Sequence, residues 1–597
     1  TNQTNGVILS QDALSITAPS LMNDGTIQGN GKTTLSAATQ ARNDGKILSG
    51  GGLVFTTPDY SGSGWLQATN LVLNVAKFAS SGTVLAANQA TLTGDSLTNS
   101  GTFQAAQLNV NAQFVNNGGT LLGNQGLSIN ASTINNENGK LFSGGDLLAE
   151  TVSLSGAGQI VALGNLALKL VNSWTSQGVV ASNKQLSVST RGDITNNATL
   201  QGDGITLDAA GKLTNNGQLT AGGGTASLSG SQIAMNASGT LQAGGDVSLA
   251  SRGSIILDGF TGTAGNLLLN ATGAIVNTAL LYAGNNLALY ANSIQNLHGD
   301  MLAGNNLVMQ KDASGAANAE VINSSGNIET INGDITIKTG HLLNTRDGLT
   351  TKTTHIDGGQ SIPGMGNSMI NVDISQLADG TYGMTSRVAE RQVGPCNGHG
   401  ACNYVHWNQF YYAMYAGSAE QKFISSQTRT DVTSNGGASR IGSGKNLTID
   451  AGSLENFASN ILANSNVSLT GGTLNNQSWQ SGTVTDWFVY QYDSRRYGYA
   501  VEPGGRYPTD GNKYHDVMPE STSIAFTLKG HDSSTELGEI YRAVIQAGGN
   551  VSANFNSDIS NTNTMSNADK ISNTIVAPNL NTPSAQSIGS DASQQAL

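Results

Sequence analysis

The feature that most restricts the fold of this chain is a pair of apolar residues, one residue apart, that recurs about every 20 residues. An L-x-L pattern places both apolar side chains on the same face of a β-strand. One such unit cannot bury its apolar face, whereas many stacked units can, so the pattern predicts a β-solenoid. The clearest pairs, of which Ala226/Leu228 is the weakest, are Leu166/Leu168, Leu186/Val188, Ile205/Leu207, Ala226/Leu228, Val247/Leu249, Leu267/Leu269, Leu287/Leu289 and Leu307/Met309.

Turn residues separate these pairs. Most pairs follow Gly, Asn or Asp, as in Gly244-Gly245-Asp246, and Gly and Asn bend the chain because both tolerate positive φ. A second set of turns, such as Asn117-Gly118 and Asn216-Gly217, recurs between the pairs. We therefore expect three short strands and three corners in each coil, with Asn side chains stacked into hydrogen-bonded ladders at equivalent corners.

The repeat divides the chain into a solenoid and two inserts. It runs through residues 1–348, resumes at 440–477 and returns at 544–565. The stretches without it, residues 349–439 and 478–543, are predicted to be non-repetitive inserts. Residues 566–597 contain mainly Ser, Asn, Ala and Gln, a composition that indicates a loosely packed tail or a linker.

The inserts hold most of the aromatic residues. All but three of the 15 Tyr, namely Tyr60, Tyr282 and Tyr290, lie within residues 349–543, together with three of the five Trp. Tyr, Trp and Arg dominate binding hot spots. An insert also needs aromatic residues for a core of its own, so each of them can serve either purpose.

Several units resemble the repeats of filamentous haemagglutinin. They are Asp193-Ile194-Thr195-Asn196-Asn197 and Lys212-Leu213-Thr214-Asn215-Asn216, each preceded by Gly, with Gly244–Leu249 and Gly548–Ala553. The resemblance covers residues 20–348, 440–477 and 544–565, and it implies an all-β, right-handed parallel β-helix with two extra-helical inserts. Proteins of that family leave Gram-negative bacteria by two-partner secretion and form surface filaments.

The order of a repeat block, aromatic inserts and an Asn/Ser-rich segment is similar to part of the CdiA effectors of contact-dependent growth inhibition. That resemblance implies a secreted, surface-exposed, monomeric filament with an outer-membrane secretion partner. It also implies that the inserts bind an outer-membrane β-barrel protein of a neighbouring bacterium. The alternative is an adhesin for host glycans or host receptors. The candidate receptor-binding residues are Trp407, Tyr411, Tyr412, Trp487, Tyr490, Tyr492, Arg495, Arg496 and Tyr497.

The two cysteines lie close together in a loop of the first insert. The spacing Cys396-x2-His399-x2-Cys402-x3-His406 offers four possible zinc ligands but matches no common finger. A disulfide between Cys396 and Cys402 suits an oxidising exterior and is favoured over zinc.

The charged residues argue against several other functions. The net charge is −12, which disfavours nucleic acid as a partner because such a partner requires a basic footprint. β-Helical enzymes group their carboxylates for calcium or acid/base chemistry, whereas Asp203, Asp246 and Asp334 are scattered singly along the ladder. We therefore predict no enzymatic activity, no catalytic residues, no cofactor and no metal.

Overall fold

The computed structural model describes residues 1–358, 362–392, 394–400, 402–495, 515–519, 521–562, 573–580 and 582. These residues form two compact units, and each unit is assembled from separate stretches of the chain. The first comprises Thr1–Asp347, Asn435–Ser478 and Arg542–Leu597, and the second comprises Gly348–Ser434 and Trp479–Tyr541. Within the described ranges, no helix is long and apolar enough to cross a bilayer.

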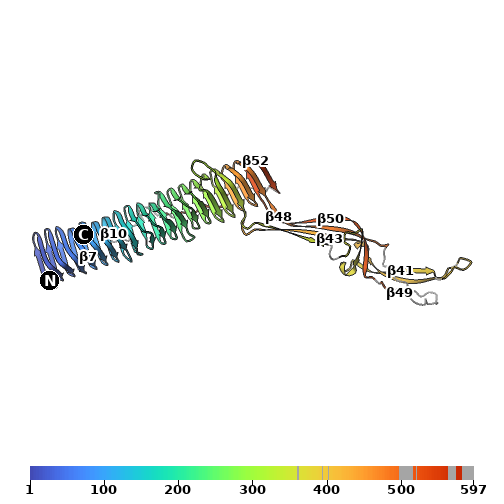
Figure 1. Ribbon diagram of the computed structural model, residues 1–597, viewed down its shortest axis with the longest axis horizontal. Coiled ribbons are helices and arrows are strands. Elements are labelled where there is room, and N and C mark those ends of the chain that lie inside the picture. The colour runs from blue at the N-terminus through green and yellow to red at the C-terminus, as the bar shows by residue number, and fades with distance from the viewer. Residues whose placement is uncertain are drawn as a thin grey trace. The chain divides into compact units, whose positions relative to one another are not determined.

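The first unit is a right-handed parallel β-helix of about 23 turns, which Figure 1 shows as a rod of stacked coils. In its middle part each coil has three strands, as predicted: β17 (Gln185–Thr190), β18 (Ile194–Asn196) and β19 (Thr199–Gly202). These strands pair in parallel with β20 (Gly204–Ala209), β21 (Lys212–Asn215) and β22 (Gln218–Ala221) of the next coil. Near the first coils the strands are longer and continue through the corners, as in β8 (Thr83–Asn99), β9 (Thr102–Asn117) and β10 (Thr120–Asn135).

The apolar pairs form the core of the solenoid. Leu186 aligns with Ile205 and Val188 with Leu207, and all four side chains are buried. Even the weak pair Ala226/Leu228 is fully inside. The predicted inward position of the apolar pairs is therefore confirmed. Each pair is buried because it stacks on the pair of the adjacent coil.

Asparagine side chains form the predicted hydrogen-bonded ladder at one corner. The Nδ2 of Asn296 donates to Oδ1 of Asn323 over 2.9 Å, and Asn323 donates to Asn344 over 2.9 Å. Asn344 then donates over 2.8 Å to Asn456, which lies in the next coil but 112 positions further along the chain. The buried amides are satisfied by one another, so an insertion between coils does not interrupt the ladder.

The solenoid continues across both inserts. Strand β37 (Asn327–Thr330) pairs with β44 (Arg440–Ser443), and β38 (Ile335–Thr345) pairs with β45 (Leu447–Phe457). The second interruption is bridged in the same way by β46 (Asn460–Ala463) with β51 (Val544–Ala547), and by β47 (Val467–Gln477) with β52 (Val551–Thr562). Residues 435–439, placed in the first insert by the sequence pattern, belong to the solenoid unit.

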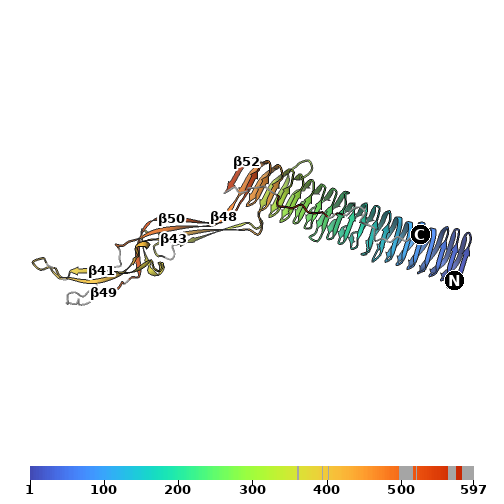
Figure 2. The same cartoon turned by 180° about the vertical axis from the view of Figure 1, so that it is seen from behind.

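The second unit contains strands from both inserts. Its five-stranded antiparallel sheet has the order β39-β43-β48-β50-β40, in which β43 (Glu420–Thr433) comes from the first insert and β48 (Trp479–Tyr492) from the second. The other strands are β39 (Thr350–Asp357), β40 (Met369–Asp373) and β50 (Ser523–Tyr541). Both views show β43, β48 and β50 side by side (Figures 1 and 2). The two inserts are therefore one folded body.

A smaller sheet completes the second unit. The strands β41 (Tyr382–Gln392) and β42 (Tyr404–Met414) form an antiparallel hairpin, and β49 (His515–Val517) pairs in parallel with β42. Two short 3₁₀ helices, Ile374–Gln376 and Ala416–Ser418, flank this hairpin in the sequence.

Candidate functional site

Tyr490, one of the candidate contact residues, lies in the aromatic core of the second unit. Tyr490 is 0% exposed and packs with Phe526, Ile524 and Val372. Its hydroxyl donates to the carbonyl oxygen of Asn367 over 2.9 Å and accepts from the Gly366 amide over 3.0 Å. A side chain with no exposed surface and a satisfied hydroxyl supports the fold and cannot contact a partner.

The other candidates of the second insert lie in different surroundings. Trp487 is half-buried on β48, and its indole N–H donates to Oγ of Ser534 over 3.1 Å. Tyr492 is half-buried and packs against the aromatic core, whereas Arg495 is exposed. Arg496 and Tyr497 lie outside the described residues.

In the hairpin, strand alternation separates the candidates of the first insert. Tyr411 is opposite Thr385 and Tyr412 is opposite Met384, so the two neighbouring tyrosines project from opposite faces. Trp407 lies on the Tyr411 face and is only 8% exposed. Trp407 therefore serves mainly for packing, and Tyr411 and Tyr412 cannot act as one adjacent pair.

The opposite face of the hairpin carries an exposed apolar surface. Met384, Val388 and Tyr404 are 48%, 58% and 47% exposed. Phe410 and Tyr412 lie on the same face, opposite Ser386 and Met384, but both are half-buried and Tyr412 packs against the core of the unit. We call these five residues the hairpin face. Exposed apolar side chains gathered on one face are typical of an interaction surface.

Sequence reasoning missed four of the five residues of the hairpin face, all except Tyr412. Met384 and Val388 lie four positions apart, an even spacing that places both side chains on one face of a strand. The abundance of Tyr and Trp indicates which residue types can anchor a partner. The alternation of side chains along each strand decides which of them share a face.

Charged pairs occur in both sheets of the second unit. On the hairpin face, His406 Nδ1 lies 3.6 Å from a carboxylate oxygen of Glu390. In the five-stranded sheet, Lys422 contacts Asp532 over 2.5 Å and Lys529 contacts Glu420. The hydrogen bond from Lys422 lowers the pKa of Asp532, and the same bond raises the pKa of Lys422. These groups are about half exposed, so the pairs contribute little to stability.

The loop between β41 and β42 is closed by a disulfide between Cys396 and Cys402. Their sulfurs are bonded to each other, so they are not free to bind zinc together with His399 and His406. Among the described residues, no three His, Cys, Asp or Glu side chains are grouped closely enough to hold a metal ion.

We expect no thiol of the purified chain to react with a maleimide in denaturant without reductant, and both to react after reduction. The chain contains only two cysteines, so the count of labels by intact mass is unambiguous. The short loop limits the stabilisation to about 2–3 kcal/mol, confined to the hairpin tip. Two labels without reductant would exclude the disulfide, and zinc that co-purifies and is removed by a chelator would favour the metal site.

A long solenoid interrupted by a non-repetitive unit is typical of a repeat filament protein. The sequence comparisons identify the same class of protein. The haemagglutinin repeat matches residues 1–56, 61–113, 104–169, 175–217, 218–279, 262–329, 314–362 and 425–486. The chain belongs to the haemagglutinin-repeat family.

Three relatives share almost the whole chain. The tRNA nuclease CdiA of Escherichia coli strain STEC_O31 is 58% identical over 591 residues, which cover 98% of this chain and 18% of that protein. The tRNA nuclease CdiA of Escherichia coli strain NC101 is 46% identical over 603 residues, and the 16S rRNA endonuclease CdiA of Enterobacter cloacae is 43% identical over 618 residues. Both alignments cover 100% of this chain and 18% of the relative. This chain thus spans about 18% of the length of these relatives. No solved structure is significantly similar to it.

Proposed function

We propose that this chain is part of a CdiA-type filament of contact-dependent growth inhibition, secreted to the surface of a Gram-negative bacterium by an outer-membrane partner. The second unit recognises an outer-membrane β-barrel protein of a neighbouring bacterium. The nuclease activities named for the relatives belong to proteins of which this chain matches only 18%, so we assign this segment projection and recognition rather than catalysis.

The observation that carries this proposal is the exposed apolar hairpin face, which lies on the unit that does not repeat. Met384, Val388 and Tyr404 offer area for anchoring contacts. The outward positions of the solenoid are mostly small or polar, although exposed apolar residues such as Val72, Phe114 and Val152 occur there too. A partner that distinguishes one site needs a surface that occurs once. The resemblance to CdiA effectors supports a β-barrel receptor.

The double variant Val388→Asp/Tyr404→Ala is expected to weaken attachment to target bacteria about 30-fold or more. Both side chains are largely exposed, so the variant removes anchors worth ~2 kcal/mol or more while the fold is retained. Attachment is measured as the concentration of fluorescent protein that half-saturates cells of related bacteria. Val484→Asp, an exposed apolar position on β48, is the matched control and should bind as the wild type does.

A folded double variant that binds bacteria as tightly as the wild type would exclude the hairpin face as the receptor contact. Binding of the wild type to erythrocytes but to no bacterial cell would replace the bacterial receptor by the host adhesin alternative.

A further inference from the structure

One ladder of the solenoid carries a column of residues that point away from the core. In these strands the residue before the column, such as Met301 or Ile328, belongs to the core, so the next side chain faces outward. The strands are β25 (Thr240–Ala243), β28 (Thr261–Thr263), β31 (Leu280–Ala283), β34 (Asp300–Ala303), β37, β44, β46 and β51. We call the aligned residues Gln242, Gly262, Tyr282, Leu302, Glu329, Gly442, Leu462 and Gln546 the outer column.

Glu329 is the only carboxylate in the outer column, and its side chain has no exposed surface. Its neighbours in the column are Leu302 and Gly442, neither of which can donate a hydrogen bond from its side chain. A buried carboxylate in such a place is strongly destabilising unless other groups donate to it. The chain must therefore bring donors to Glu329 from elsewhere.

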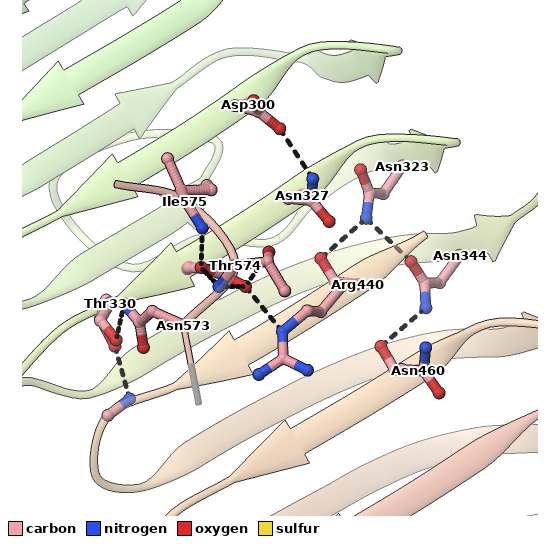
Figure 3. Close-up of polar contacts among 12 residues, drawn as sticks. Asp300, Asn323, Asn327, Thr330, Asn344, Arg440, Asn460, Asn573, Thr574 and Ile575 are labelled. Carbon is pink, nitrogen blue, oxygen red and sulfur yellow. Dashed lines mark hydrogen bonds and ion pairs between the residues drawn. The ribbon is translucent and has the colours of Figure 1, made fainter. Parts of the chain in front are cut away.

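The donors come from the chain beyond the last coil and from Arg440. The amide N–H groups of Thr574 and Ile575 donate to Glu329 Oε2 over 3.0 and 3.1 Å, and the Thr574 hydroxyl donates to Oε1 over 2.8 Å. Arg440 Nε lies 2.6 Å from Oε1, and Asn573 Nδ2 donates to the Thr330 carbonyl oxygen over 3.4 Å. Figure 3 shows Asn573, Thr574 and Ile575 gathered beside Thr330 and Arg440. Charge-assisted bonds of this kind are among the stronger hydrogen bonds in proteins.

Three glycines lie beside the side chains of this arrangement. A methyl group at Gly442 would lie 3.1 Å from Arg440 Nε, so a bare backbone there lets the guanidinium lie across the column. A methyl group at Gly262 would lie 2.5 Å from Phe260 Cζ and 3.3 Å from Leu580 Cδ2. A methyl group at Gly244 would lie 3.6 Å from Thr582 Oγ1.

These contacts set a direction for the segment. Residues 573–575 lie at the coil of Glu329, Leu580 lies at the coil of Gly262, and Thr582 lies near Gly244. The segment therefore runs against the order of the coils, from later coils toward earlier ones. Ile575, Pro578 and Leu580 are half-buried, whereas Val576 is 84% exposed.

We propose that residues 573–580 are a latch that docks on the outer column and that Glu329 is the residue that recognises it. The ligand of this site is an extended peptide segment that presents two consecutive backbone N–H groups and a hydroxyl. Glu329 lies on the coil before the first insert and Arg440 on the coil after it, so the carboxylate that holds the latch also joins these two coils through its bond to Arg440. It also turns the chain that follows the last coil back along the solenoid.

Disulfide trapping tests the position of the latch in the whole chain. Gly262→Cys/Leu580→Cys should form a cross-link that a shift in mobility under non-reducing conditions detects. The matched control is Thr220→Cys/Leu580→Cys, because Thr220 aligns with Gln242 and Gln242 aligns with Gly262, so Thr220 lies two coils before Gly262. A cross-link at 262 in high yield and at 220 in low yield is expected. Equal yields, or no cross-link at 262, would overturn the docked position.

Hydrogen exchange tests the role of Glu329. Glu329→Gln should accelerate exchange of the amides of residues 573–580 about tenfold or more, as expected for loss of charge-assisted hydrogen bonds. Ile575→Pro removes one donor from the latch without altering the solenoid, so it should loosen the latch while the β37–β44 amides keep their protection. Glu150→Gln, which breaks an exposed ion pair with Lys169, is the matched control and should change neither. Unprotected latch amides in the wild type, or unchanged exchange in both variants, would overturn the proposal.

Discussion

A chain in which residues 348–434 and 479–541 are both replaced by short Gly/Ser linkers should keep a folded solenoid and lose attachment to target bacteria. The second unit contains the hairpin face and further exposed apolar residues, among them Met369, Tyr415 and Leu537. Removing it should reduce attachment to the background of an unrelated protein, a larger loss than any point variant can cause. Cell binding and the far-ultraviolet circular dichroism of the shortened chain are the measurements.

Both inserts must be removed together. Strand β43 of the first insert pairs with β48 of the second, and β40 of the first pairs with β50 of the second. Deleting one insert would leave sheet edges of the other unpaired, and the resulting aggregation would hide the effect on binding.

The solenoid offers two suitable points of excision. The Asp347 carbonyl oxygen accepts from the Asn435 amide over 2.9 Å, and the Ser478 hydroxyl accepts from the Ala543 amide over 2.9 Å. Each pair of chain ends is thus already in contact, so a linker of a few residues closes the gap. A folded, shortened chain that still attaches to bacteria would contradict recognition by the second unit and favour an adhesin that binds along the solenoid.

Leu287→Asp should lower the free energy of unfolding of the solenoid by about 5 kcal/mol or more. Leu287 is 1% exposed and stacks between Leu267 and Leu307 of the adjacent coils. Losing the leucine side chain costs about 2–5 kcal/mol, and a carboxylate without a partner in the core costs several more. Denaturant unfolding followed by circular dichroism measures the change.

Ala288→Asp is the matched control for this variant. Ala288 follows Leu287 directly, faces away from the core and is half-buried, so a carboxylate there remains hydrated. We expect a change within about 0.5–1 kcal/mol. If Leu287→Asp unfolds at the same denaturant concentration as the wild type, the inward assignment of the apolar pairs is wrong.

The solenoid could be predicted from the sequence because its contacts are local in the repeat. Each coil contacts only its two neighbours. The L-x-L pairs and the corner asparagines therefore predict, for every coil, which side chains stack. Even the weak pair Ala226/Leu228 keeps its place, since the coils on either side hold it in register. The same regularity located the inserts, because they are the stretches in which the pattern stops.

The sequence by itself therefore determined the coil, its core and the asparagine ladder, whereas the tertiary structure decided which surfaces can bind. Tyr490 and Trp407 are of the residue types that dominate binding hot spots, yet packing buries both. The shared sheets of the two inserts and the contact of Glu329 with Thr574, 245 positions apart, join segments that have no repeat in common. Such pairings depend on shape and hydrogen-bond complementarity formed only once in the molecule, so no periodic signal in the sequence records them.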